Sequence, residues 1–363
     1  MSRIPRVLAV LVLAAVLLPA SAGARVSGDF VGLTSEDLFA GRTAYRQATL
    51  AKQRAAGVGL IRQTFKWSQI ERAPGDYRFG RYDAYVAEAA RRGISILPIL
   101  YNPPSFRSSR PSKGARRGTY PPRDPKAMGR LGAALVRRYG PAGTLWAQRP
   151  DVPRRPVRSW QVWNEPNLRF YWPRGPNARS YTRLLAATGR AIKQVDRRAE
   201  IVTAGLPESR LPGSVSLGRF IRGMYRAGGR RAFDTLAVNA YARDSREVDR
   251  RLRAVRRSMN ARRDRRARIW VTELGWCDRG VKSRFCVGAK GQANRIRSSL
   301  RLIAKRRRSL RLRGVVYYSW RDGRPYPPLY QQFWGLHSGL LTTSGARKPA
   351  FAAFARGARA LRR

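Results

Sequence analysis

SWQVWNEPN, residues 159–167, is the segment from which the architecture of this chain can be read. Its first five residues are apolar and aromatic enough to form a buried strand. Pro166 ends that strand, because proline has no N–H with which to continue a β-ladder. Glu165 is therefore predicted at the C-terminal tip of a core strand. A second segment, RIWVTELGW at residues 268–276, has the same form, and its strand ends at Glu273.

Strand-like and helical segments alternate along the rest of the chain. Some runs, such as residues 94–100, are almost continuously apolar, which is typical of parallel strands covered on both faces. Eight strand–helix units, with no room for further elements, predict a single (β/α)8 TIM barrel of the α/β class over residues 25–363. No Gly-x-Gly-x-x-Gly follows the first strand, which disfavours a dinucleotide-binding fold. The predicted strands are residues 30–33, 60–65, 94–100, 159–163, 201–204, 235–239, 269–272 and 314–318, and the predicted helices are residues 43–56, 78–92, 127–139, 178–198, 217–227, 245–262, 288–305 and 348–361.

Residues 1–24 have the pattern of a secretory signal peptide. A short basic start precedes an apolar run at residues 7–18, and Ala22 and Ala24 each follow small residues that suit cleavage. The alternative is a retained N-terminal anchor, although the run is short for a membrane span. We expect a secreted, extracellular protein, with association to the cell surface as a further expectation.

The chain has two cysteines, Cys277 and Cys286, and one histidine, His337. In an oxidising compartment the cysteines are expected to form a disulfide that closes one loop beside Glu273. Serine or cysteine chemistry of the triad type would have to use the single histidine, which disfavours both. No cluster of metal ligands is evident, so we expect neither a metal nor another cofactor.

In a (β/α)8 barrel the active site forms at the C-terminal ends of the strands, where Glu165 and Glu273 are both predicted. Two carboxyl groups that meet across one opening can flank a glycosidic bond. The blander alternatives are that both glutamates are strand-end partners of arginines and that the aromatic residues pack the core or rim. The candidates for substrate contact are Arg62, Trp67, Tyr101, Asn164, Asn239, Tyr241, Trp276 and Trp320.

These residues resemble clan A of the retaining glycoside hydrolases, particularly families 5 and 39. The resemblance extends from about residue 30 to residue 354. The chain departs from family 5 at Asn239, where a histidine is usual, and at the third strand, which ends without a histidine. Besides the two glutamate motifs, the resemblance includes Arg62 and Trp67, ERAPGDY at residues 71–77, Tyr241, WGL at residues 334–336, and Lys348-Pro349.

The resemblance implies a role for each main candidate. Glu165 would be the acid/base, Glu273 the nucleophile, and Asn164 would hold the sugar 2-hydroxyl. Tyr241 and Arg62 would contact the nucleophile, and Trp320 would form the floor beneath the reacting sugar.

The chemistry agrees with these roles. A glycosidic oxygen is a poor leaving group and needs a proton donor, and burial together with the charge of Glu273 can keep Glu165 protonated. A retaining double displacement places the two carboxyl groups roughly 5–5.5 Å apart, and we predict this short separation.

The formal net charge of +54 comes from 75 Lys and Arg residues against 21 Asp and Glu. Many arginines directly precede predicted strands, so they belong to the face of the barrel opposite the catalytic mouth. Cations there complement helix C-terminal dipoles, and a compositional bias toward arginine is a second plain explanation. The functional alternative is that this basic face docks the protein on an anionic cell wall or membrane surface.

The leading hypothesis is therefore a secreted retaining glycosidase that acts as a monomer on a carbohydrate. The competing hypotheses are a carbohydrate-binding barrel without turnover and a polyanion-binding barrel at the cell surface. Specific nucleic-acid binding is disfavoured, because the basic clusters lack interleaved aromatic residues.

Overall fold

The computed structural model describes residues 26–324 and 333–362. The predicted signal peptide, residues 1–24, lies outside the described residues, as does part of the loop that follows the last strand. No helix in these two described ranges is long and apolar enough to cross a membrane.

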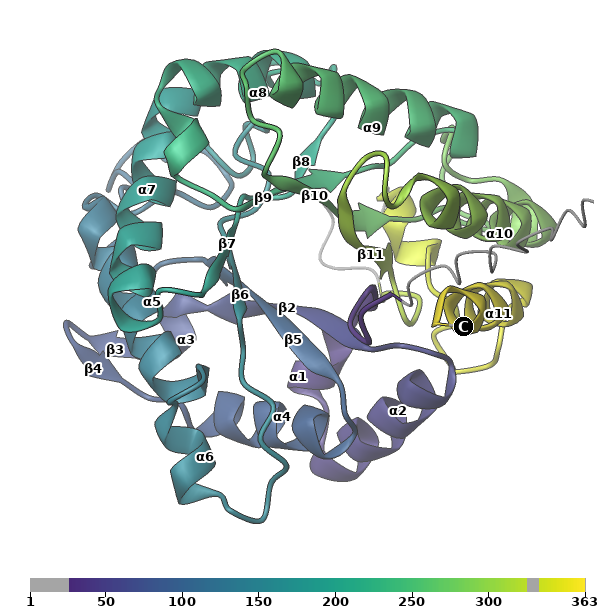
Figure 1. Ribbon diagram of the computed structural model, residues 1–363, viewed down its shortest axis with the longest axis horizontal. Helices are drawn as coiled ribbons and strands as arrows, with labels where there is room; N and C mark the ends of the chain where they lie inside the picture. The colour runs from purple at the N-terminus through teal and green to yellow at the C-terminus, as the bar shows by residue number, and fades with distance from the viewer. Residues whose placement is uncertain (1–25, 325–332, 363) are drawn as a thin grey trace, which may run out of the picture.

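Eight parallel strands form a closed ring, which confirms the predicted (β/α)8 barrel (Figure 1). The ring closes because β10 pairs with β9 on one side and with β11 on the other, while β11 pairs with β1. The ring strands are β1 (Val31–Thr34), β2 (Leu60–Lys66), β5 (Ser95–Tyr101), β6 (Ser159–Val162), β7 (Glu200–Val202), β9 (Thr235–Asn239), β10 (Arg268–Leu274) and β11 (Leu312–Tyr318).

A helix follows each ring strand and packs outside the ring (Figure 1). Side-chain caps define several helix starts: Asp124 accepts a hydrogen bond from the backbone of Lys126 at 2.8 Å, and Asn177 accepts one from Ser180 at 2.9 Å. These outer helices are α2 (Thr43–Ala55), α4 (Gly80–Arg91), α5 (Pro125–Tyr139), α7 (Ala178–Val195), α8 (Leu217–Arg226), α9 (Ser245–Asn260), α10 (Gly288–Arg306) and α11 (Pro349–Arg362).

Short helices and strands occupy the connections between the ring strands and the outer helices. The expectation that the eight strand–helix units leave no room for further elements was therefore wrong. Their lengths of two to five residues give too little hydrophobic periodicity to be recognised in the sequence. They are α1 (Asp37–Ala40), α3 (Trp67–Ile70), the hairpin β3 (Glu71–Ala73) and β4 (Asp76–Tyr77), α6 (Thr144–Gln148), β8 (Leu206–Pro207), and the 3-10 turns Gly229–Arg231 and Trp334–His337.

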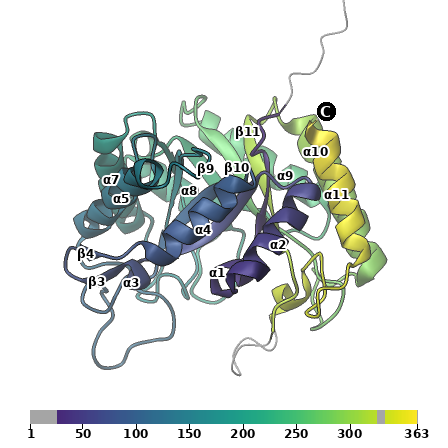
Figure 2. The same ribbon diagram turned by 90° about the horizontal axis from the view of Figure 1, so that it is seen from below.

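The connections that follow the strands gather on one side of the barrel. In Figure 2, α1, α3 and the β3–β4 hairpin lie on this side, and the C-terminus of the chain lies on the opposite side. The face at the C-terminal ends of the strands is therefore the mouth, and the αβ turns form the base.

The barrel interior is a packed core. Leu60, Leu97, Val202, Ala237, Trp270 and Val316 form one buried cluster inside the ring, separate from the larger core between ring and helices. Trp270 fits because Gly314 faces it: a Cβ on Gly314 would lie 3.0 Å from Trp270 Nε1 and 2.6 Å from the carbonyl oxygen of Phe30. The interior therefore supports a floor beneath the mouth.

The predicted disulfide between Cys277 and Cys286 is confirmed. It closes a short loop directly after β10, and its neighbour Phe285 lies 6.3 Å from the ring of Tyr241. The bond thus anchors part of the rim of the mouth.

Candidate active site

The two glutamates lie at the mouth, at the ends of two ring strands. Glu273 is the sixth residue of β10, and Glu165 lies three residues beyond the end of β6. Trp163 and Glu165 both have left-handed backbone conformations, with φ of 73° and 42°. Such values are uncommon for residues other than glycine, and they concentrate at functional sites. This local geometry bends the chain sharply where Glu165 enters the mouth.

Arg62 of β2 joins the two segments through three hydrogen bonds. Its Nη1 lies 2.6 Å from Glu273 Oε1, its Nη2 donates to Asn164 Oδ1 at 2.9 Å, and its Nε donates to Gln161 Oε1 at 2.8 Å. The guanidinium side chain is only 2% exposed. Such charge-assisted contacts are strong and directional, so Arg62 holds the Glu273 carboxylate in one orientation.

Tyr241 supplies the second partner of Glu273. Its hydroxyl donates to Glu273 Oε2, the carboxylate oxygen that Arg62 does not contact. Burial and the negative charge of Glu273 raise the pKa of the Tyr241 hydroxyl well above its usual value, so the phenol keeps its proton. Both oxygens of Glu273 are therefore held by donors.

Glu165 has a different environment, and the pKa of its carboxyl is raised to about 8. Burial is the larger cause, and the negative charge of Glu273 is the second. Hydrogen bonding from Asn239 and the positive charge of Arg62 act in the opposite direction and lower this pKa. At neutral pH Glu165 is therefore mainly a carboxylic acid, able to donate a proton.

Asn239 connects the two glutamates through the sheet. It pairs in register with Glu273 across β9 and β10, and its Nδ2 donates to Glu165 Oε1 at 2.6 Å. Its Oδ1 accepts a hydrogen bond from Thr272 Oγ1 at 2.9 Å, which fixes the orientation of the amide. Because Oε1 of Glu165 accepts from an N–H, the acidic proton is directed to Oε2. The Asn239 amide thus positions the acid, and its expected contact with substrate stays a prediction.

Aromatic residues surround the carboxyl groups. Tyr101 lies edge-on to Trp163 at 4.9 Å between ring centroids, and its ring is 5.9 Å from that of Tyr171. On the other side, Trp334 lies 4.8 Å from both Tyr241 and Phe285. All of these rings except Trp163, which is fully buried, are half-buried, and together they form two walls of the mouth.

Three tryptophans expected to contact substrate have no free face for a sugar. Trp67 and Trp276 are 0% exposed, and Trp320 is 1% exposed. Trp67 donates to Glu71, Trp276 donates to the carbonyl of Ala242 at 2.8 Å, and Trp320 packs against Phe351. Their predicted role as sugar contacts is wrong, because the turns after the strands direct these indoles into the core.

Tyr318 occupies the position expected for Trp320. It is the last residue of β11, it is half-buried, and its ring lies 6.3 Å from that of Tyr241. Sequence reading also missed Gln161, Thr272, Phe285 and Trp334 as site residues. Gln161 carried a signal, since it is a polar residue within an apolar strand. The others are placed by contacts between segments far apart in the chain.

Solved structures share this fold. A family 39 glycoside hydrolase from Bacteroides cellulosilyticus WH2 has a TM-score of 0.63 and 18% identity, covering 93% of this chain and 65% of that chain. The GH39 enzyme from Xanthomonas axonopodis pv. citri has a TM-score of 0.64 and 18% identity, and the match covers 92% of this chain and 67% of that chain. A monomeric beta-xylosidase from Caulobacter crescentus CB15 has a TM-score of 0.63 and 18% identity, and the match covers 91% of this chain and 69% of that chain.

The present chain thus spans about two thirds of the length of these proteins. No family model and no curated protein sequence matches it. At these identities the similarity establishes the shared barrel fold, as the resemblance of the strand-end motifs implied.

Proposed function

We propose that the protein is a secreted retaining glycoside hydrolase that cleaves β-glycosidic bonds by double displacement. The observation that carries the proposal is the asymmetry between the two carboxyl groups. Glu273 is held by Arg62 and Tyr241, whereas the pKa of Glu165 is raised to about 8. Paired carboxyl groups in opposed environments are the arrangement that acid and nucleophile roles require.

In the first step Glu273 attacks the anomeric carbon while Glu165 gives its proton to the departing glycosidic oxygen. The bond from sugar to leaving group breaks as the bond to Glu273 forms, which leaves a covalent glycosyl-enzyme and an ionised Glu165. In the second step Glu165 takes a proton from water, and the resulting hydroxide displaces Glu273. The product keeps the configuration of the substrate.

Asn164 is positioned to contribute to substrate binding. Its Oδ1 accepts from Arg62 Nη2, so its Nδ2 remains available to donate on the other side of the amide. A sugar 2-hydroxyl is the acceptor that the resemblance to clan A suggests. Hydrogen bonds to this hydroxyl strengthen in the transition state.

Hydrolysis of an aryl β-glycoside panel tests the proposal. Aryl β-xyloside is the first substrate to try, because one protein of similar fold carries the name beta-xylosidase. Glu273→Gln should abolish turnover. Glu165→Ala should slow the hydrolysis of substrates with poor leaving groups far more than that of substrates with activated ones. Added azide should restore the hydrolysis rate of this variant. NMR of the first-formed product should show retention. Inversion would contradict double displacement, and an inactive wild type that still binds sugars would favour the silent binding barrel.

The positively charged face at the base of the barrel supports a second proposal. We propose that this face docks the exported protein on an anionic surface. Part of this charge is compensated internally, since Arg313 pairs with Asp29 at 2.5 Å and Arg268 pairs with Glu200 at 2.7 Å. Lys305 is exposed and makes no ion pair among the described residues. Reversing the charge of Lys305 and its exposed neighbours should reduce retention on anionic beads. Neutralising the mouth loop, residues 107–123, should leave retention unchanged. The opposite pattern would favour an acidic substrate bound at the mouth.

A further inference from the structure

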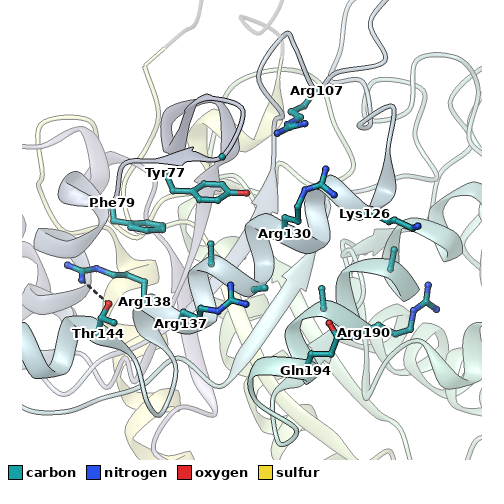
Figure 3. A pocket seen from close by; sticks show the side chains of 15 residues that line it. Tyr77, Phe79, Arg107, Lys126, Arg130, Arg137, Arg138, Thr144, Arg190 and Gln194 are labelled. Carbon is teal, nitrogen blue, oxygen red and sulfur yellow. Dashed lines mark hydrogen bonds between the residues drawn. The ribbon is translucent and has the colours of Figure 1, made fainter.

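A groove of about 760 Å³ lies on the outer wall of the barrel, away from the catalytic glutamates. It is bounded by the β3–β4 hairpin, α5 and α7 (Figure 3). Tyr77 and Phe79 line one side of it, and Arg130 and Arg137 project from α5 beside them. None of these four residues contributes to the mechanism above, so the groove is a separate feature of the surface.

Small residues form the floor of the groove. Ala133 and Ala134 of α5 and Ala187 and Ala191 of α7 line it. The two helices approach closely at Gly129, where a Cβ would lie 3.1 Å from the Cβ of Ala191 and 3.2 Å from the carbonyl oxygen of Ala187. Short side chains at a close helix crossing leave a shallow apolar furrow, and longer side chains rise on both sides of it.

Cations surround this floor, and no carboxylate among the described residues lines the groove. Three of the cations, Arg107, Arg130 and Arg138, each form an ion pair with a carboxylate outside the groove lining, at N–O distances of 2.7–3.3 Å. The others, Lys126, Arg137 and Arg190, are exposed and make no ion pair within residues 26–324 and 333–362. An anion is therefore the complementary occupant. The six cations are Arg107, Lys126, Arg130, Arg137, Arg138 and Arg190.

The aromatic pair distinguishes a sugar from a simple anion. The rings of Tyr77 and Phe79 lie nearly parallel, at an interplanar angle of 19° with centroids 6.2 Å apart, and both are half-buried. Rings of this kind present broad, rigid apolar faces at low entropic cost. The C–H faces of a pyranose match such a surface, whereas an inorganic phosphate or a lipid headgroup has no matching apolar face.

The direction of the groove connects it to the mouth. Lys126 lies in the first turn of α5, at the mouth side of the barrel, and Arg137 lies near the end of this helix. The eleven intervening steps correspond to about 16 Å along the helix axis. The cations therefore extend from the rim of the mouth toward the base, along a path that an extended oligosaccharide can follow.

We propose that this groove binds an acidic oligosaccharide, with its carboxylates on the free cations and its sugar faces on Tyr77 and Phe79. The proposal rests on the proposed carbohydrate substrate and narrows it to a polymer with uronic-acid residues. The groove would hold the polymer on the enzyme while the mouth cleaves it.

Binding of oligogalacturonate to the full chain, measured by calorimetry, tests the proposal, with the carboxyl-reduced neutral oligosaccharide as a second probe. All proteins carry Glu273→Gln, so that no probe is cleaved. The groove variant combines Lys126→Glu, Arg137→Glu and Arg190→Glu. The matched control combines Arg257→Glu, Arg301→Glu and Arg356→Glu, three exposed cations of α9, α10 and α11 with the same change in net charge.

The groove variant should weaken oligogalacturonate binding by about tenfold or more, and the control should weaken it by less than about twofold. Tyr77→Ala should weaken it too, and it provides a second test if the triple variant melts early. The neutral oligosaccharide should bind much more weakly than the acidic one.

Equal losses in groove and control variants would overturn the proposal in favour of non-specific charge attraction. Groove-dependent binding to phosphatidylglycerol vesicles, without binding of oligogalacturonate, would overturn it in favour of a lipid surface. Because binding is measured without turnover, failure here is distinguishable from failure of the proposed hydrolysis.

Discussion

Replacing Asn239 with alanine should move the alkaline limb of the pH–rate profile upward. The Asn239 amide donates to Glu165 Oε1 at 2.6 Å and favours the ionised carboxylate, so it partly offsets the burial and the Glu273 charge that together leave the pKa raised to about 8. A hydrogen bond to a charged group contributes about 1.5–3 kcal/mol, and 1.36 kcal/mol corresponds to one pKa unit. The pKa of Glu165 should therefore rise by about one to two units in the variant.

The assay is kcat/KM for an aryl β-glycoside across the pH range, because its alkaline limb reports the acid in the free enzyme. Thr272→Val is the matched control: it removes only the hydroxyl that orients the Asn239 amide, and it should shift the limb in the same direction by less. The variants should also lose rate on poor leaving groups, since the acid proton is no longer directed to Oε2. An alkaline limb that stays in place or moves down in Asn239→Ala would refute this account of the acid.

Three further changes act on the same network. Gly205→Ala should lower kcat, because the new Cβ would lie 2.2 Å from Asn239 Oδ1 and must displace that amide; steady-state kinetics and a crystal structure would check it. Tyr241→Phe removes the donor to Glu273 Oε2 and should reduce kcat/KM by about 10- to 100-fold, with melting temperature as the control for folding. Glu165→Gln should stabilise the fold more at pH 8 than at pH 5. The raised pKa of Glu165 means that the folded state binds more protons than the unfolded state between about pH 4.5 and 8, so wild-type stability falls over that window. Thermal melts of wild type and Glu165→Gln at pH 5 and pH 8 test this. A difference in melting temperature between the two proteins that is the same at both pH values would contradict it.

Much of the barrel could be predicted from local sequence. The helix from Thr43 ends at Ala55 against a predicted end at residue 56, and β9 has the predicted bounds, Thr235–Asn239. Hydrophobic periodicity and glycine or proline punctuation are local properties, and they persist in the folded chain. The two-residue elements β4 and β8 are stabilised by pairing with partners elsewhere, so local sequence carries little trace of them.

The orientation of the aromatic side chains could not be predicted from local sequence. Trp67, Trp276 and Trp320 follow strands just as a sugar platform would, yet all three are buried in the core. Tyr318 and Trp334 lie beside Tyr241 instead. The orientation of a side chain after a strand depends on the path of the turn and on what packs against it. Neither is encoded in the spacing of residues along the chain.

The sequence by itself determined that two glutamates stand at the C-terminal ends of parallel strands, because a strand and the proline or glycine that ends it are neighbours in the chain. The tertiary structure alone decided which glutamate keeps its proton. That difference depends on the burial of Glu165, on the Asn239 amide 74 residues away, and on Arg62, which pairs with Glu273 across 211 residues. A pKa responds to everything within a few ångströms in space, and only the closed barrel brings those groups together.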